Sequence, residues 1–214
     1  MAVILILWAS PASSQAKLPG ALSLAELEKK ILVFDAAGRP LRFDHAPRFF
    51  LALGPDAAAI AHLLGAFGPG RDRLIGMEKP PGSSDPLLER LDPGFRKKIL
   101  LAPGWTVPAV VALKADVVLA RGRKLEEPFK TLAETGIPVV LLGLDSPEHY
   151  ERDISIVGAL LAAAARADEL IHYYRGLYGR VVIGTAGLSA EVKPRVLLAR
   201  AALAGRTAVL SLPP

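Results

Sequence analysis

Four short, continuous apolar runs constrain the fold of this chain more than any other feature. They cover residues 49–53, 74–77, 117–120 and 139–142. A run without polar alternation indicates a strand that is covered on both faces, as in parallel sheets flanked by helices. The stretches between the runs have helical patterns, at residues 57–67, 107–114 and 126–135. This β-α-β succession predicts right-handed crossovers and an α/β fold, in which a mostly parallel sheet lies between two layers of helices.

The segments around these runs predict further elements. Residues 31–35 and 41–44 alternate in polarity around a glycine turn, which predicts a hairpin. Residues 78–104, rich in Pro, Gly, Ser and Asp, predict a long loop over the carboxyl edge of the sheet, with a short helix near residues 86–91. A helical pattern follows Ser146-Pro147. It predicts either one helix of about 45–50 Å or two helices that break near residues 162–165.

The last part of the chain predicts one more alternation of elements. Strands are expected at residues 196–199 and 207–212, with a short helix between them. The chain has a net charge of +5, but its basic residues are scattered and the densest cluster is followed at once by Glu126 and Glu127. A soluble, mildly basic protein without a nucleic-acid partner is therefore expected.

Several classes of chemistry lack their sequence signals. The chain has no cysteine, which excludes disulfides, thiol catalysis and Cys-based metal centres. It also lacks the glycine-flanked serine of hydrolases, the paired histidines of metalloproteases, a P-loop and a dinucleotide fingerprint. We therefore expect neither an enzyme nor a bound cofactor.

The N-terminus resembles a secretory signal. Residues 2–9 form an apolar run too short to span a bilayer, and small residues follow up to Ala16. This predicts a signal peptide over residues 1–16 and a periplasmic or secreted protein. No Lys or Arg precedes the run, which leaves two alternatives open: a start upstream of Met1, or a buried strand in place of the signal.

The predicted sheet places a candidate ligand site at the carboxyl ends of its strands, where parallel sheets bind ligands. Residues from four segments are expected at this edge: Gly54, Pro55, Asp56, Met77, Glu78, Lys79, Trp105, Arg121 and Arg123.

Each of these candidates also has a purely structural interpretation. Asp56 stands where a helix N-cap is expected, and we favour that role over ligand contact. Trp105 is either a stacking platform for a flat chelate or ordinary surface. Arg121 and Arg123 either bind carboxylates in a forked geometry or are solvated loop charges, and Glu78 and Lys79 have the same alternatives.

Metal-ligand patterns are absent from the sequence. The four histidines have no ligand spacing, and each is expected on a helix surface or a loop: His45, His62, His149 and His172. Tyr173 and Tyr174 are adjacent on a predicted helix and point about 100° apart, so they cannot readily hold one ion. No metal site is expected.

A family resemblance emerges when these segments are taken in order. The residues that carry it are Asp35-Ala36-Ala37-Gly38-Arg39, Pro47-Arg48, Gly54-Pro55-Asp56-Ala57, residues 74–76, residues 112–119, residues 132–140, Asp153-Ile154 and Gly158. From about residue 31 to residue 199, the chain resembles the periplasmic substrate-binding proteins of iron–siderophore, haem and cobalamin ABC importers.

The resemblance implies two α/β lobes joined by a long helix, with the ligand in the cleft between the lobes and a membrane permease as the partner. It implies an N-terminal lobe at residues 17–146, a connecting helix at 147–180 and the start of a truncated C-terminal lobe at 181–214. The implied function is delivery of a metal chelate, with ferric siderophore expected first and haem, cobalamin or an oxyanion as alternatives. A monomer is expected.

The sequence also departs from the family pattern. Where relatives carry an Asn-Leu-Glu triplet whose Glu contacts the permease, this chain has Thr106, Val107 and Pro108, and the family's Lys-Pro-Asp is Lys114-Ala115-Asp116. The usual docking carboxylate is thus missing at this position. Two other functions stay open: an α/β enzyme, and a non-binding truncated remnant of the family.

Overall fold

The computed structural model describes residues 30–80, 86–189, 191–193, 198–201 and 207–210. The chain divides into two compact units, one that ends at Ala167 and one that begins at Asp168. The predicted signal peptide lies outside the described residues.

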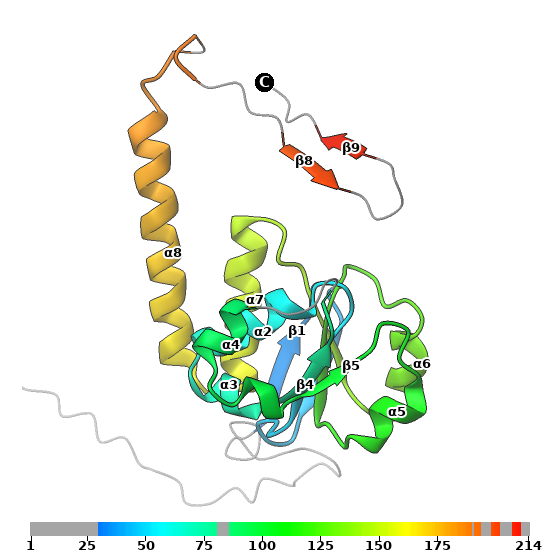
Figure 1. Ribbon diagram of the computed structural model, residues 1–214. Helices are drawn as coiled ribbons and strands as arrows, with labels where there is room; N and C mark the ends of the chain where they lie inside the picture. The colour runs from blue at the N-terminus through cyan, green and yellow to red at the C-terminus, as the bar shows by residue number, and fades with distance from the viewer. Residues whose placement is uncertain (1–29, 81–85, 190, 194–197, 202–206, 211–214) are drawn as a thin grey trace, which may run out of the picture. The chain divides into compact units, whose positions relative to one another are not determined.

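A five-stranded parallel sheet forms the centre of the first unit (Figure 1). Its strands are β3 (Phe50–Leu53), β4 (Leu74–Glu78), β5 (Ile99–Leu101), β6 (Val117–Arg121) and β7 (Val139–Leu142). They lie in the order β5-β4-β3-β6-β7, and every adjacent pair is parallel. The four strands predicted from apolar runs are confirmed. Strand β5 was missed, because it lies in the segment interpreted as a loop.

The predicted hairpin is confirmed as β1 (Ile31–Phe34) paired antiparallel with β2 (Pro40–Phe43). It is tied to the outer edge of the sheet, because the backbone N–H of Ala36 donates to the carbonyl of Leu141 in β7 at 2.8 Å. The segment between β4 and β6 contains the predicted helix α4 (Pro86–Leu91) and a short 3-10 turn, η1 (Phe95–Lys97).

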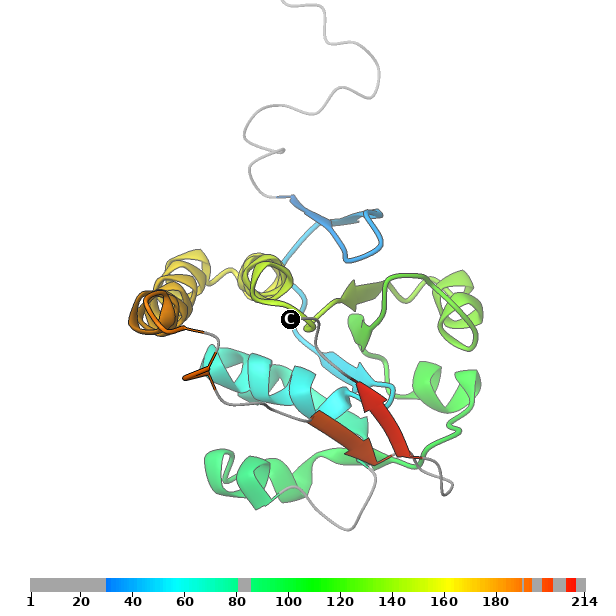
Figure 2. The same cartoon turned by 90° about the horizontal axis from the view of Figure 1, so that it is seen from above.

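Helices cover both faces of the sheet (Figure 2). On one face lie α5 (Val107–Ala112) and α6 (Phe129–Glu134), and on the other lie α2 (Ala57–Ala66) and α7 (Pro147–Leu160). A short helix, α3 (Pro69–Arg73), leads from α2 into β4. The predicted three-layer α/β architecture is therefore confirmed.

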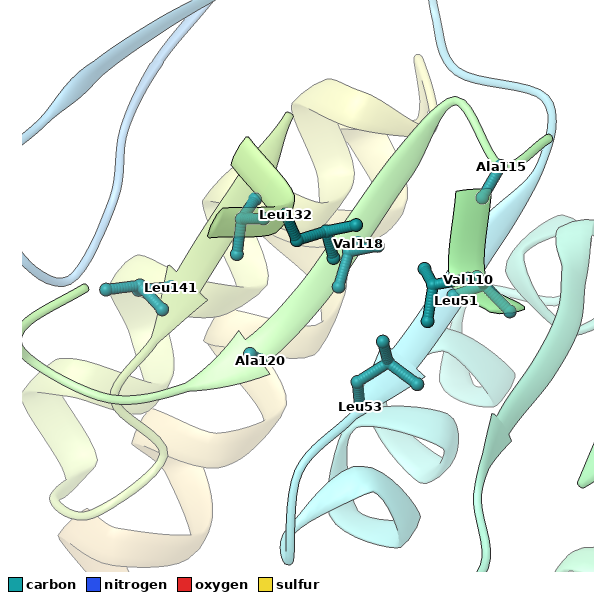
Figure 3. Close-up of a cluster of buried hydrophobic side chains, with 9 residues drawn as sticks. Leu51, Leu53, Val110, Ala115, Val118, Ala120, Leu132 and Leu141 are labelled. Atoms are coloured by element: carbon teal, nitrogen blue, oxygen red, sulfur yellow. The ribbon is translucent and has the colours of Figure 1, made fainter. Parts of the chain in front are cut away.

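The core explains why the strand sequences do not alternate. Side chains on one face of β3, β6 and β7 form a buried cluster with Val110 of α5 and Leu132 of α6 (Figure 3). Because successive side chains point to opposite faces, Phe50 and Leu119 lie on the other face, and they are also fully buried. Both faces of these strands exclude water, so every position in them is apolar except Arg121, the exposed last residue of β6.

The segment after β7 forms two helices. Helix α7 begins after Ser146, whose side chain accepts a hydrogen bond from the backbone of His149, and α8 runs from Ala164 to Thr185. The backbone of Ala162 between them has a φ of 54°, which no α-helix continues through. The alternative of two helices is confirmed, and a single continuous helix is wrong. No helix of the described residues is long and apolar enough to cross a membrane.

The second unit contains most of α8 and an antiparallel hairpin of β8 (Leu198–Ala201) and β9 (Thr207–Leu210). The two strands predicted near the end of the chain are thus present. The short helix predicted between them lies outside the described residues.

Candidate functional site

The strand order creates a topological switch point between β3 and β6. The chain leaves β3 toward β4 on one side and returns to β6 on the other side, so the connections at the carboxyl ends of β3 and β6 diverge. Ligands of open parallel sheets bind in the crevice at such a point. The rim of the sheet around this point is the candidate site.

An ion pair spans the switch point. Nη1 of Arg121, the last residue of β6, lies 3.1 Å from Oδ2 of Asp56, which follows β3. The two side chains are 32% and 28% exposed, so the pair is neither free in solvent nor buried. Nε of Arg121 also donates to the carbonyl of Gly143 at 2.9 Å. One guanidinium therefore joins the carboxyl ends of β3, β6 and β7.

The prediction that Asp56 caps a helix is wrong for its side chain. Asp56 occupies the N-cap position of α2, but its carboxylate accepts no hydrogen bond from the helix backbone. The carboxylate points instead to Arg121. An ionised guanidinium offers a stronger, charge-assisted partner than a neutral N–H, and the parallel pairing of β3 and β6 brings it within reach.

Glu78, the last residue of β4, connects two other parts of the rim. Its Oε2 accepts hydrogen bonds from the backbone N–H of Gly54 at 2.7 Å and from Nε1 of Trp105 at 2.8 Å. The ring of Trp105 packs against Phe129, with centroids 5.4 Å apart and planes tilted by 59°. Trp105 is half-buried, so part of its indole is accessible at the rim.

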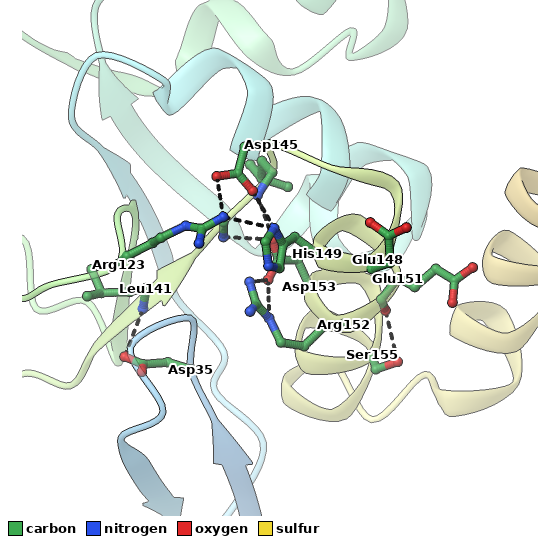
Figure 4. Close-up of polar contacts among 12 residues, drawn as sticks. Asp35, Arg123, Leu141, Asp145, Glu148, His149, Glu151, Arg152, Asp153 and Ser155 are labelled. Carbon is green, nitrogen blue, oxygen red and sulfur yellow. Dashed lines mark hydrogen bonds and ion pairs between the residues drawn. The ribbon is translucent and has the colours of Figure 1, made fainter. Parts of the chain in front are cut away.

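A second polar cluster lies where β6 and β7 end (Figure 4). Nη2 of Arg123 donates to Oδ2 of Asp145 at 2.9 Å, and Nδ1 of His149 lies 2.6 Å from Oδ1 of the same carboxylate. The hydrogen bond from Arg123 is the main cause that lowers the pKa of Asp145, and His149 lowers it further. His149, which the sequence placed on an ordinary surface, thus belongs to a cluster whose members the sequence did not connect.

The remaining candidates differ in how they meet the rim. Gly54 is buried in the turn after β3, and Pro55 beside it is exposed. Lys79 is exposed, and its backbone N–H donates to the carbonyl of Leu101. Met77 has no exposed surface, because it lies inside the core. Its prediction as a ligand contact is therefore wrong for this conformation.

Two buried carboxylates that the sequence analysis did not assign to the site hold the rim in place. Oδ2 of Asp153 accepts from the backbone N–H groups of Gly143 and Leu144 at 2.7 and 2.8 Å, and its Oδ1 accepts from Arg152. Asp35 accepts from the backbone of Leu141 and pairs with the guanidinium four residues ahead of it. Both aspartates lay in the segments that carry the family resemblance, which was the available signal.

No set of three or more His, Asp or Glu side chains within the described part of the chain is arranged to hold a metal ion. Besides carboxylates that are already paired within the protein, the rim offers guanidinium groups, the indole of half-buried Trp105 and the exposed ammonium group of Lys79. These groups suit an organic or anionic ligand better than a bare cation.

Comparison with known proteins adds the fold relationship. No protein-family model and no curated protein matches this sequence. Among solved structures, a periplasmic haem-binding protein of Pseudomonas aeruginosa matches with a TM-score of 0.57 at 20% identity, over 76% of this chain and 56% of that one. A molybdate-binding protein of Haemophilus influenzae matches with a TM-score of 0.60 at 16% identity, over 75% and 55% of the two chains.

A third match is a TroA-like periplasmic binding protein of Veillonella parvula, with a TM-score of 0.61 at 18% identity, over 77% of this chain and 51% of that one. The chain has the fold of these binding proteins. It spans about half the length of the solved structures that it matches. The first two of these proteins are named for the ligands that they bind, haem and molybdate, and the third is named only as a periplasmic binding protein.

Proposed function

We propose that this chain is the substrate-binding component of an ABC importer, that it works in the periplasm or outside the cell, and that its cargo is a chelated metal. The observation that carries the proposal is the Asp56–Arg121 pair across the switch point of the sheet, together with the indole of Trp105 that Glu78 holds at the same rim. The shared fold supports it, because the matched proteins include binders of haem and of molybdate.

The chemistry of the rim favours a cargo with acidic groups on an organic scaffold. Arg121 and Arg123 can each fork a carboxylate or a comparable anion, and Trp105 can stack on a flat or apolar face. Ferric siderophores and haem combine these features, and we place ferric siderophores first. Binding the acidic group of a ligand at Arg121 would require it to compete with Asp56, which tunes affinity rather than preventing binding.

Catalysis is the less favoured alternative for the same rim. A general base must accept a proton near the working pH. The hydrogen bond from Arg123 lowers the pKa of Asp145, which makes this carboxylate a weaker base. The described rim groups are thus suited to holding charges in fixed places.

The direct test is ligand binding by the full chain. Haem, ferric citrate, a ferric hydroxamate, a ferric catecholate, cobalamin and molybdate would be titrated while tryptophan emission and the melting temperature are recorded. A ligand at a hundred times its Kd stabilises the folded state by about 2.7 kcal/mol. For a protein of this size, this corresponds to a rise in Tm of about 5–11 °C.

The matched variants are Arg121→Ala at the rim and Arg90→Ala on α4, an exposed arginine away from the rim. We expect Arg121→Ala to weaken binding of the responding ligand and Arg90→Ala to leave it unchanged. If no probe changes the emission or the Tm of the wild-type chain, the proposed function is wrong. If both variants lose the same affinity for the ligand, the binding site does not lie at the switch point.

A further inference from the structure

Glu78 occupies an unusual position among the rim residues, because a single oxygen of its carboxylate serves two other segments. Oε2 accepts from the backbone N–H of Gly54, which follows β3, and from Nε1 of Trp105, in the loop after β5. Glu78 itself ends β4. Since β3, β4 and β5 are neighbours in the sheet, this one carboxylate joins the carboxyl ends of three adjacent strands.

A fourth residue, Phe129, packs against two of these three residues. The ring of Trp105 packs on Phe129 of α6 at 5.4 Å. Phe129 also covers the α-carbon of Gly54, where an added Cβ would lie 3.6 Å from the ring. These contacts connect all four residues to one another. We call the set the Trp105 platform: Gly54, Glu78, Trp105 and Phe129. Hydrogen bonds fix the polar edge of the indole, and aromatic packing fixes its ring.

Two roles for Glu78 can be distinguished from these contacts. If cargo bound Glu78 through Oε2, this oxygen would have to release two N–H donors. Leaving buried or half-buried donors without a partner is unfavourable, and charge-assisted bonds of this kind are among the stronger ones in proteins. Gly54 is buried, so its N–H has no easy replacement in solvent. The contacts therefore favour an internal role.

We propose that Glu78 is a positioning residue that holds the indole of Trp105 in the orientation needed to stack on cargo, and that it does not itself contact the cargo. The stacking part of this inference rests on the proposed function. The physical basis is preorganisation: a tryptophan on a loop that is free to change rotamer must be ordered when the ligand binds, and this ordering weakens affinity. Glu78 orders it beforehand.

The test starts from Trp8→Phe, which leaves Trp105 as the only tryptophan, because the chain has two. In this background Glu78→Ala removes the acceptor, and Glu78→Gln keeps an acceptor oxygen of the same reach without the charge. The matched control is Glu89→Ala, which removes a glutamate that pairs with the exposed Arg96. Far-UV circular dichroism checks that all variants fold.

The first readout is the tryptophan band of the near-UV circular dichroism spectrum, together with acrylamide quenching of Trp105, both without ligand. We expect Glu78→Ala to lose the band and to quench faster, and Glu78→Gln and Glu89→Ala to resemble the parent. If Glu78→Ala keeps the parent spectrum and quenching, the positioning role is wrong. This readout needs no cargo, so it decides the inference about the indole independently of the proposed function.

The second readout is haem and ferric-siderophore affinity. Losing the preordering of one large side chain corresponds to roughly a twofold to tenfold weaker Kd, and we expect this in Glu78→Ala but not in Glu78→Gln. Equal, large losses in both variants would indicate that the charge contacts cargo, which overturns the inference and leaves the proposed function standing. A parent chain that binds no probe would overturn the proposed function instead.

Discussion

The carboxylate of Asp153 gives the sharpest test of how the rim is held. Asp153 is fully buried in α7, and it accepts four hydrogen bonds. Two come from the backbone N–H groups of Gly143 and Leu144, in the turn after β7, and two from the guanidinium of Arg152. Asp153→Asn keeps the shape but replaces one acceptor oxygen with an NH2 group. Whichever way the amide turns, this group faces donors.

The magnitude follows from these contacts. If the NH2 faces the backbone, the N–H of buried Gly143 and that of half-buried Leu144 lose their acceptor, at about 1–3 kcal/mol each. If it faces Arg152, a half-buried guanidinium loses its partner, and breaking a buried charge pair costs about 3–5 kcal/mol. We therefore expect a loss of about 3 kcal/mol, which lowers Tm by about 6–12 °C for a chain of this length.

The assay is thermal unfolding followed by far-UV circular dichroism, with urea unfolding as a second measure. Asp72→Asn is the control, because its side chain is 77% exposed, and such surface changes alter stability by about 0.5 kcal/mol or less. A melting temperature of Asp153→Asn within about 2 °C of wild type would refute this account of the turn. It would mean that the contacts of Asp153 do not limit stability.

Three further predictions concern the core, the polar cluster and the crevice. Leu132→Ala, at a fully buried core position, should lower the free energy of unfolding by about 2–5 kcal/mol, whereas Leu87→Ala, 53% exposed, should change it little, as measured by urea unfolding. Arg123→Ala should raise the pKa of Asp145 toward its ordinary value, measured by carboxyl NMR, because the lost hydrogen bond is the main cause of the lowered pKa. With Arg123 present, the stability that Asp145 contributes is present above the ordinary carboxyl pKa and is lost as pH falls through the lowered one. Arg121→Lys should weaken anionic cargo in a binding titration, because Lys cannot form the fork.

The fold was largely predictable, and the exception has a clear physical reason. Four of the five strands are buried on both faces. Burial on both faces requires apolar residues at successive positions, so each of these strands appears in the sequence as an apolar run. Strand β5 lies at the edge of the sheet, and Ile99 and Leu100 are 42% and 47% exposed. It is three residues long and directly follows Lys97 and Lys98. An edge strand so short leaves no periodic signal, and the surrounding Pro, Gly and Asp residues indicated a loop.

The site was predictable as a set of residues but not as a set of partners. The rule that parallel strands carry ligands at their carboxyl ends places Asp56, Glu78 and Arg121 on one rim without any coordinates. Their pairing depends on strand order, and a sequence of alternating elements is compatible with several orders. The sequence therefore predicted that Asp56 caps its own helix, because the N-terminus of that helix was the only nearby partner that the sequence indicated.

The observed order β5-β4-β3-β6-β7 resolves this ambiguity and explains which rim residues become partners. Because β6 pairs with β3, Arg121 reaches Asp56 across the switch point. Because β4 lies on the other side of β3, Glu78 reaches Gly54 and Trp105 but is two strands away from β6. Phe129 of α6, which follows β6, packs on Trp105 and thus links the platform to the other side of β3. The rim thus carries a guanidinium and an indole, the combination that an acidic organic chelate can use.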